Sequence, residues 1–371
     1  MISIIFTILS ILIILRILKW RSEKELIERI SGRYVLISGC DSGFGRRLVE
    51  RLLMKGMNVF AGCFTDEGEK SLQNDCSQLP GKLYTVSLDI TSQKSVDNCF
   101  AFVSQILKEN ESKLWALVNN AGFLAVYGPM DWIGIEEYEQ SVGVNLLGAI
   151  RMTKKFTQLI KISKGRIVTM ISASGRLHGF YTAPYVAAKF GLEGYVDNLR
   201  LEMKPFGIKV SIIEPGAFKT TLMNPEAMIR RVESVWSKLT LMNPDAMIRR
   251  VESVWSKLSE DVRDEYGDDF KDNYIQSFNA GTSLVANRNI DIVTDAYIHA
   301  LCAKSPRARY VCGWDAKYIF IPMSFMPSTW QDFLLQLMMN ITSGSKLPAA
   351  LMNNNTLSIN NNPPQCPLAP C

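Results

Sequence analysis

The chain is poor in the side chains that several common kinds of site require. It contains two histidines, His178 and His299, so a histidine-based zinc site or a Ser-His-Asp triad has few candidates. Its eight cysteines show no Cys-x-x-Cys spacing, which favours mostly free thiols over a metal cage or a disulfide framework. The net charge is only +5, and no run is rich in lysine and arginine. We therefore expect neither a metal nor nucleic acid as a partner.

Long apolar runs are scarce as well, and the most continuous one begins the chain. Residues 1–15 are almost entirely apolar and are followed by four basic residues, of which Arg16 is the first. A membrane span needs roughly 20 residues, and Leu18 completes the run if Arg16 snorkels. We predict a retained membrane anchor over residues 1–20, with the positive flank on the cytoplasmic side. A cleaved signal peptide is the alternative, although no basic residue precedes the run and no small-residue cleavage site follows it.

The other end of the chain holds a second apolar segment and then a polar one. Residues 326–341 predict a helix with Trp330, Phe333 and Leu337 on neighbouring turns. Such a helix either lies on a membrane surface or caps a substrate pocket. Residues 342–371 are rich in asparagine, serine and proline, which predicts a disordered tail.

Between these ends, strand-like apolar runs alternate with helical patterns. Alternation of this kind predicts an α/β fold with a doubly wound parallel sheet. No linker interrupts the pattern, so we predict a single domain over residues 31–325. The predicted strands are Tyr34–Ile37, Val59–Ala61, Leu83–Val86, Trp115–Val118, Arg166–Ile171 and Val210–Ile213.

A tandem duplication interrupts the regular pattern over residues 221–258. Thr221–Leu239 is followed at once by Thr240–Leu258, and the two copies differ only by Asp245 in place of Glu226. A repeat protein needs at least three units, so the duplication does not indicate a solenoid. It is either a tolerated tandem insertion or an error in how the sequence was assembled. Each copy predicts an amphipathic helix, and we expect one copy to be enough to cover a substrate pocket.

A glycine-rich turn follows the first predicted strand. Residues 38–45 read Ser-Gly-Cys-Asp-Ser-Gly-Phe-Gly and lead into a helical pattern. Glycines at such a turn let the backbone approach a pyrophosphate, and the helix N-terminus supplies unpaired N–H groups. The spacing Gly-x-x-x-Gly-x-Gly resembles the short-chain dehydrogenase/reductase family, with Ser38 where that family usually has threonine. The resemblance covers about residues 33–325 and implies a Rossmann-type fold that binds a nicotinamide dinucleotide.

Further segments match motifs of this family in the family's order, although each alone also fits a simple capping turn. Asp89 matches the aspartate that contacts the adenine ring, and residues 119–122, Asn-Asn-Ala-Gly, match the strand-end motif beside the cofactor. Pro215-Gly216 with Thr220 matches Pro-Gly-x-x-x-Thr, in which the threonine meets the nicotinamide carboxamide. The resemblance thus implies cofactor contacts from Gly39, Ser42, Gly43, Phe44, Gly45, Asp66, Asp89, Ile90, Asn119, Ala121, Gly122, Tyr185, Lys189, Pro215, Gly216 and Thr220.

The choice between NAD and NADP depends on the residues that end the second predicted strand. Residues 62–66 read Gly-Cys-Phe-Thr-Asp and include no arginine or lysine to neutralise the extra phosphate of NADP. We predict NAD, with NADP as the alternative. Asp66, one or two positions later than usual, is the predicted acidic contact to the ribose.

The candidate catalytic residues are Ser172, Tyr185 and Lys189. Tyr185 and Lys189 lie four apart in a helical pattern, so their side chains face the same way, and Ser172 follows a predicted strand. A phenol with a reference pKa of about 10 is a poor acid–base at neutral pH, and a nearby ammonium lowers that pKa. In the family this trio is catalytic: the serine holds the substrate oxygen, and the lysine also binds the nicotinamide ribose. The resemblance adds Asn145, which supports a proton-relay water, and leaves Ser174 as the alternative serine.

Within the family, residues 39–45, residues 213–216 and the apolar N-terminus resemble the retinol dehydrogenase and hydroxysteroid dehydrogenase branch. This implies hydride transfer to or from a lipophilic retinoid or steroid, at a membrane of the endoplasmic reticulum, by a chain that forms a homodimer. The apolar ends alone indicate only an apolar substrate. Two other functions stay open. One is an NADP-dependent carbonyl reductase, and the other is a non-enzymatic dinucleotide-binding scaffold, against which the intact trio argues.

Overall fold

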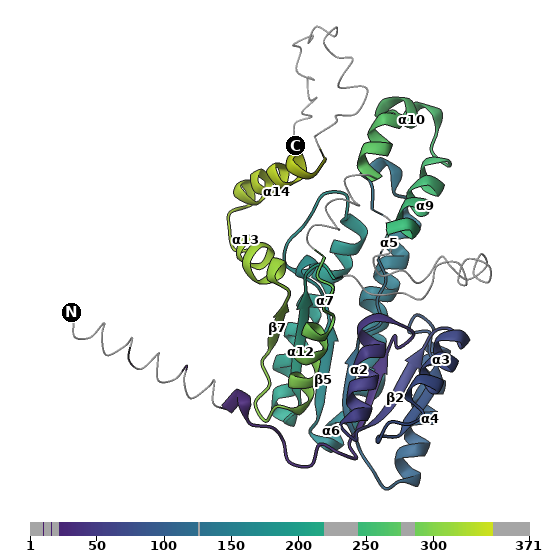
Figure 1. The fold of residues 1–371 in the computed structure, drawn as a ribbon, viewed down its shortest axis with the longest axis vertical. Helices are drawn as coiled ribbons and strands as arrows, with labels where there is room; N and C mark the ends of the chain where they lie inside the picture. The colour runs from purple at the N-terminus through teal and green to yellow at the C-terminus, as the bar shows by residue number, and fades with distance from the viewer. Residues whose placement is uncertain are drawn as a thin grey trace, which may run out of the picture.

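A computed structural model describes residues 22–124, 127–218, 244–275 and 286–343, together with Ser10 and Arg16. Its centre is a parallel sheet of seven strands in the order β3-β2-β1-β4-β5-β6-β7 (Figure 1). The six predicted strands are all confirmed. The strands are β1 (Tyr34–Ser38), β2 (Asn58–Cys63), β3 (Leu83–Ser87), β4 (Leu114–Asn119), β5 (Arg166–Met170), β6 (Lys209–Pro215) and β7 (Arg309–Cys312).

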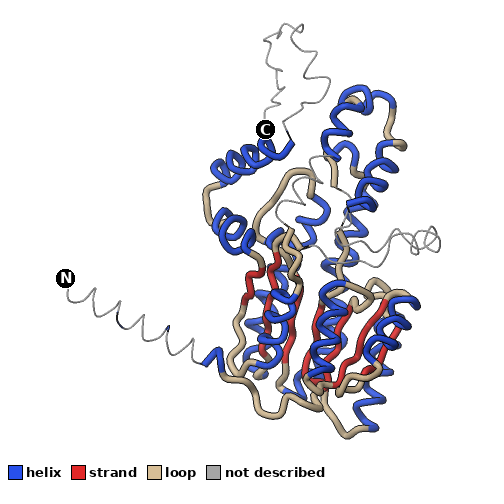
Figure 2. The backbone as a smooth tube through the Cα atoms, in the orientation of Figure 1, coloured by secondary structure: helices blue, strands red, loops and turns tan. Residues whose placement is uncertain are grey.

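Helices cover both faces of this sheet, which forms the middle layer in Figure 2. On one face, the core joins the sheet to α2, α3 and α12, and on the other it joins the sheet to α4, α6 and α7. Strands covered on both sides read as continuous apolar runs, and every residue of β1, β4 and β5 is buried. The helices around the sheet are α2 (Gly43–Met54), α3 (Asp66–Cys76), α4 (Gln93–Glu109), α5 (Ile135–Val142), α6 (Ala149–Ser163), α7 (Ala183–Met203) and α12 (Asp291–Cys302).

Further helices lie above the carboxyl ends of the strands (Figure 1). Helices α9 (Pro244–Trp255) and α10 (Glu260–Tyr266) follow β6, and α13 (Ile321–Met323) and α14 (Ser328–Ser343) follow β7. Helix α9 belongs to the second copy of the duplicated segment, whereas the first copy, Thr221–Leu239, lies outside the described residues. Helix α14 occupies the segment where the sequence predicts an apolar helix.

The segment that precedes β1 is attached to the end of α12. The ring of His299 lies 2.8 Å from the carbonyl oxygen of Glu23 and 2.7 Å from the hydroxyl of Tyr310. The guanidinium of Arg307 meets the Glu23 carboxylate at 2.7 Å, and Ile27 donates its N–H to the carbonyl of Cys302. Residues 22–27 are therefore joined to the domain near the amino end of β7.

The predicted anchor and the polar tail fall largely outside the described part of the chain, residues 1–20 except for Ser10 and Arg16, and residues 344–371. Within the described residues, no helix combines the length and the apolar composition that crossing a bilayer requires.

Candidate functional site

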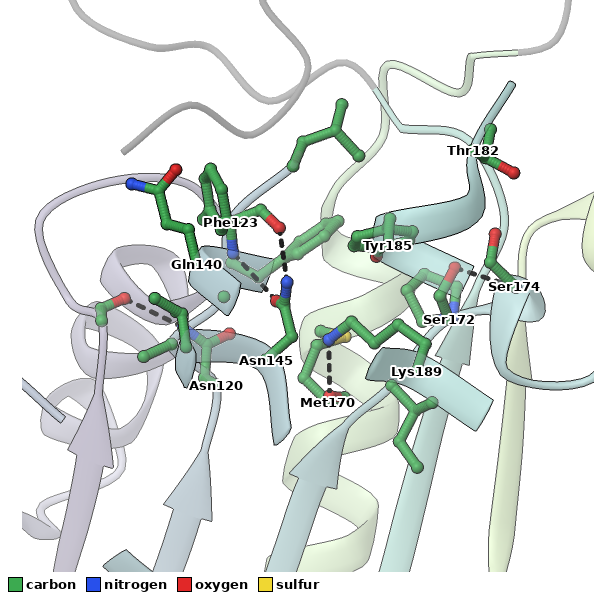
Figure 3. Close-up of a pocket in the computed structure, with 18 of the residues that line it drawn as sticks. Asn120, Phe123, Gln140, Asn145, Met170, Ser172, Ser174, Thr182, Tyr185 and Lys189 are labelled. Carbon is green, nitrogen blue, oxygen red and sulfur yellow. Dashed lines mark hydrogen bonds between the residues drawn. The ribbon is translucent and has the colours of Figure 1, made fainter. Parts of the chain in front are cut away.

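The site is a cavity of about 770 Å³ at the carboxyl ends of β1, β4, β5 and β6. Ligands of open parallel sheets bind at this edge, where the strand order changes direction between β1 and β4. Every one of the candidate catalytic residues lines it, and Figure 3 shows them with their neighbours. The predicted site residues in the lining are Gly39, Ser42, Phe44, Asp89, Ile90, Ala121, Gly122, Asn145, Ser172, Tyr185, Lys189, Pro215 and Gly216.

The glycine turn between β1 and α2 brings backbone close to the cavity. Gly39 has a φ of +72°, and a Cβ there would lie 2.7 Å from the Cα of Ala121. A Cβ on Gly45 would lie 2.2 Å from the carbonyl oxygen of Gly39, so Gly45 packs beneath the turn. Ser42 makes no side-chain capping bond to α2, and the first turn of that helix carries no acidic residue. The helix N-terminus thus offers N–H groups and a positive dipole end, which fit a pyrophosphate.

An aspartate that the sequence interpretation overlooked lies where β2 ends. The carboxylate of Asp41 accepts hydrogen bonds from the N–H of Phe64 at 3.0 Å and from the N–H and hydroxyl of Thr65 at 2.8 Å. Asp41 and Phe64 line the cavity, whereas Asp66 begins α3 and is not part of the lining. Asp89 also lines it, and its carboxylate accepts from the N–H and hydroxyl of Thr91. Asp41 is therefore the carboxylate of the cavity lining that is held at the end of β2.

Ser172, Tyr185 and Lys189 come together from two elements. Ser172 follows β5 at the start of a short helical turn, where its hydroxyl accepts the N–H of Ser174 at 3.1 Å. Tyr185 and Lys189 project from consecutive turns of α7, with the Lys189 Nζ 5.6 Å from the centre of the Tyr185 ring. The Lys189 ammonium points toward the carbonyl of Met170, at 3.4 Å (Figure 3). The three groups thus border one part of the cavity.

Burial governs the pKa values of this pair. Burial raises the pKa of Tyr185 to about 12, and a hydrogen bond with Ser172 opposes that rise. Burial also lowers the pKa of Lys189 to about 7. Each group alone is thus pushed toward its neutral form. An ammonium stabilises a nearby phenolate, so the placement of Lys189 on the turn of α7 after Tyr185 favours the ionised form of that phenol.

Asn145 lies in a widened stretch of helix, the π-helical Gly143–Gly148, between α5 and α6. Its side-chain oxygen accepts the N–H of Phe123 at 3.0 Å, and its amide donates to the carbonyl of Phe123 at 2.8 Å and to Ser141 at 3.2 Å. The side chain is buried and held on both ends (Figure 3). Widened helical turns of this kind are frequent at functional sites.

The turn after β6 is held by a buried carboxylate. Asp315 accepts the N–H of Ala217 at 2.6 Å, and a Cβ on Gly216 would lie 2.2 Å from the same carboxylate. Glycine is therefore required at position 216, and Pro215 and Gly216 both line the cavity. Thr220, the last residue of the predicted motif, lies outside the described residues.

An aromatic cluster packs beside the candidate catalytic residue Tyr185. Trp132 makes edge contacts with the rings of Trp255, Tyr266, Phe270 and Tyr274, at centroid distances of 5.0 to 5.9 Å. Tyr185 belongs to the same apolar cluster. Trp255 and Val251 come from the second copy of the duplication, and both are buried.

Three of the predicted cofactor residues support the cavity without lining it. Gly43 begins α2 and has a φ of +59°, Gly45 packs under Gly39, and Asn119 donates its amide to the hydroxyl of Thr153 at 2.8 Å. Apart from Asp41, the lining residues that sequence reasoning missed are mostly apolar, and no motif marks them. They include Phe64, Phe123, Leu124, Tyr127, Gln140, Leu177, Phe320 and Leu335.

Comparisons with known proteins agree with this geometry. The model of the short chain dehydrogenase family matches residues 33–229. The chain is 48% identical to a 3beta-hydroxysteroid dehydrogenase of Caenorhabditis elegans, over 87% of this chain and 80% of that protein. It is 34% identical to retinol dehydrogenase 7 of Rattus norvegicus, over 84% of this chain and 90% of that protein. A short-chain dehydrogenase structure from Streptomyces avermitilis has a similar fold, with a TM-score of 0.55, 22% identity and coverage of 85% and 100% of the two chains.

Proposed function

The chain belongs to the short chain dehydrogenase family and is an oxidoreductase, and we propose that it moves hydride between a nicotinamide dinucleotide and a lipophilic alcohol or ketone of the steroid or retinoid type. The observation that carries this proposal is the meeting of Ser172, Tyr185 and Lys189 in one cavity with the glycine turn at Gly39. The relatives named for hydroxysteroids and retinol support the class of substrate.

The proposed mechanism assigns one task to each side chain. The dinucleotide, when bound, accepts or supplies the hydride. Ser172 holds the oxygen of the substrate, and Tyr185 takes the hydroxyl proton in oxidation or returns it in reduction. Lys189 stabilises the phenolate form of Tyr185 and would hold the ribose of the dinucleotide. Asn145 holds the backbone of Phe123 at the side of the cavity and takes part in relaying the proton.

The cavity wall favours an apolar substrate. Phe123, Leu124, Leu177, Phe320 and Leu335 line it together with the catalytic residues. Burial of apolar area contributes about 25 cal/mol for each Å², so a steroid or retinoid gains affinity without polar partners along its length. We propose that α9 and α10, which carry much of the aromatic cluster around Trp132, form a helical lid over the substrate end of this cavity.

We expect NAD to exceed NADP by at least about tenfold in kcat/KM, because the carboxylate of Asp41 repels a 2′-phosphate and no basic side chain follows β2 to attract it. The measurement is the oxidation of androstane alcohols and of retinol by the detergent-extracted protein with each cofactor. NADP preference would favour a carbonyl reductase instead. Binding of both dinucleotides without turnover of any of these substrates would favour a non-enzymatic scaffold.

Asp41→Asn tests the structural basis of that preference. Asparagine keeps an oxygen that accepts from Thr65 and removes the charge, so the preference for NAD narrows while the β2 end stays in place. Asp66→Asn is the matched control, because Asp66 lies at the start of α3 and outside the cavity lining. If only Asp66→Asn lost the preference for NAD over NADP, Asp66 and not Asp41 would be the residue that sets this preference.

We also propose that the protein acts at a membrane, at the endoplasmic reticulum. The predicted anchor over residues 1–20 is one support, and α14 is the other. Trp330, Phe333, Leu337 and Ile341 recur at helical spacing along α14, and all four are exposed. Leu335, on the same helix, lines the cavity, so α14 carries both the exposed apolar row and part of the cavity wall.

Deletion of Ile2–Leu18 is expected to release at least part of the protein from membranes, because this run is the longest uninterrupted apolar segment of the sequence. The measurement is the distribution between pellet and supernatant after carbonate extraction of membranes from expressing cells. A shortened chain that stays wholly in the pellet would show that α14 anchors it. Adding Trp330→Ser and Phe333→Ser to the shortened chain would then release it.

A further inference from the structure

The catalytic row of α7 continues beyond the cavity. Tyr185, Lys189, Glu193 and Asp197 follow one another at four-residue spacing, so they lie on one face of the helix. The first two line the cavity, and the last two meet Arg309 on the edge strand β7. The Arg309 guanidinium contacts the Glu193 carboxylate and lies 2.5 Å from that of Asp197. The helix that carries the acid–base pair is thus tied to the sheet edge by charged groups.

The same guanidinium reaches the turn after β6. Its Nη1 lies 3.2 Å from the carboxylate of Glu214, the residue immediately before the Pro215-Gly216 turn. Glu214 also pairs with Arg176 at 3.4 Å. Arg309 therefore stands between the Tyr185–Lys189 helix and the turn beside the cofactor end of the cavity.

Arg176 connects this network to the serine turn. It ends the short helical turn after Ser172, and its N–H donates to the carbonyl of Ala173. Gly175, one residue earlier, packs so close to α7 that a Cβ there would lie 3.2 Å from the Lys189 carbonyl and 3.3 Å from the Glu193 carboxylate. The serine turn, the α7 helix and the β6 turn therefore share one set of ionic contacts.

The centre of the network is shielded from water, whereas the side chains of Arg309 and Asp197 at its edge are 29% and 37% exposed. The side chain of Glu214 is fully buried, and that of Glu193 is 11% exposed. Three arginines, at 176, 200 and 309, balance three carboxylates, at 193, 197 and 214. Burial raises the pKa of Glu214, and the charge of Arg176 opposes that rise. Buried ion pairs of this kind contribute little net stability compared with apolar packing, but removing one partner leaves a charge without compensation. Such a network instead fixes the relative positions of the helix and the turns that it joins.

We propose that Arg309 is a positioning residue for the reaction, which fixes the Tyr185–Lys189 face of α7 against the Ser172 turn and the Pro215 turn through Glu193 and Glu214. This inference rests on the proposed roles of Ser172, Tyr185 and Lys189. Arg309 lines no part of the cavity and acts only through these contacts. A shift of about 1 Å between catalytic groups is enough to lower a rate by roughly 100-fold, so their relative placement is sensitive to this residue.

The test compares Arg309→Met, Arg309→Lys and Arg200→Met. We expect Arg309→Met to lower kcat at least tenfold when activity is divided by the number of molecules that bind NAD. The KM for NAD is expected to change less than threefold. Arg309→Lys keeps the positive charge, so its kcat is expected to lie between those of Arg309→Met and the parent. Arg200 is the matched control, because among the contacts of the described residues it joins the network only through Asp197, at 3.1 Å. Its variant is expected to stay within twofold of the parent in kcat.

Each outcome decides the proposal. A folded Arg309→Met enzyme with kcat within twofold of the parent overturns it, and so does a loss of thermal stability with unchanged kcat per competent molecule. If Arg309→Met does not fold, Arg309→Lys and Glu193→Gln take its place, and unchanged kcat in both overturns the proposal. A parent chain that turns over no alcohol or ketone overturns the proposed function itself, whereas an active parent with an equally active Arg309 variant overturns only this inference.

Discussion

Replacement of Tyr185 by phenylalanine is expected to lower kcat at least about 100-fold, because acid–base catalysis by a positioned group contributes roughly 10² to 10⁴ in rate and the variant has no group to exchange the proton. The change removes one oxygen from a buried ring and leaves the apolar cluster intact. Cofactor binding depends on the glycine turn and is expected to persist. The measurements are kcat for alcohol oxidation and the dissociation constant for NADH by fluorescence.

Tyr181→Phe is the matched control for that experiment. Tyr181 lies four residues before Tyr185, in the turn that precedes α7, and packs edge to face on Tyr274 at 5.4 Å without lining the cavity. Its hydroxyl has no part in the proposed proton transfer, so kcat is expected to stay within threefold of the parent. Retention of more than a few per cent of activity by Tyr185→Phe would refute the assigned acid–base role.

Trp132→Ala is expected to raise the KM for the apolar substrate at least tenfold and to leave the KM for NAD nearly unchanged. Trp132 is buried among four other aromatic rings, and truncation of a buried tryptophan typically costs about 3–5 kcal/mol of packing. The lost packing would loosen the helices proposed as the lid. The glycine turn, which is proposed to bind the cofactor, is not part of this cluster. Steady-state kinetics with both substrates varied, together with thermal unfolding, measure these effects. An unchanged KM for the lipophilic substrate would show that this cluster does not form the substrate site.

The duplication supplies an unusual control for the lid. Trp255, in the second copy, packs on Trp132 at 5.0 Å, and Trp236 is its counterpart in the first copy. We expect Trp255→Ala to resemble Trp132→Ala and Trp236→Ala to resemble the parent. Deleting either copy gives nearly the same chain, since the products differ only by Glu226 or Asp245. A deletion is therefore expected to keep cofactor binding and activity, and only the paired substitutions tell which copy covers the site.

Features that depend on residues close together along the chain could be predicted from the sequence. Strands buried on both faces read as unbroken apolar runs, which explains the prediction of β1, β2, β4, β5 and β6. The edge strand β3 has no buried residue and was predicted from its place in the alternation of strands and helices. Strand β7, Arg309–Cys312, was missed because it is a four-residue edge strand whose burial alternates. Tyr185 and Lys189 were predicted because they lie four apart in a helical pattern, and Ser172 because it follows a predicted strand at the spacing that the resemblance to the family implies.

Contacts between distant segments could not be predicted in this way. Asp41 meets Phe64 and Thr65 only because β1 pairs with β2 in a register that sets Ser38 opposite Gly62. Sequence spacing does not contain that register, so Asp41 was not among the acidic contacts predicted from the sequence. The link from Arg309 to Glu193 spans 116 residues and likewise depends on the packed fold.

The attachment of residues 22–27 beside β7 also sets an order of events during synthesis. Glu23 is made early, but its partners His299 and Arg307 leave the ribosome some 280 residues later. At about 5–20 residues per second, the interval is on the order of tens of seconds. During that interval the amino-terminal segment lacks these partners, while β1 to β5 already have the strands that they pair with. Residues 22–27 therefore close onto residues 299–307 only after most of the domain has been synthesised.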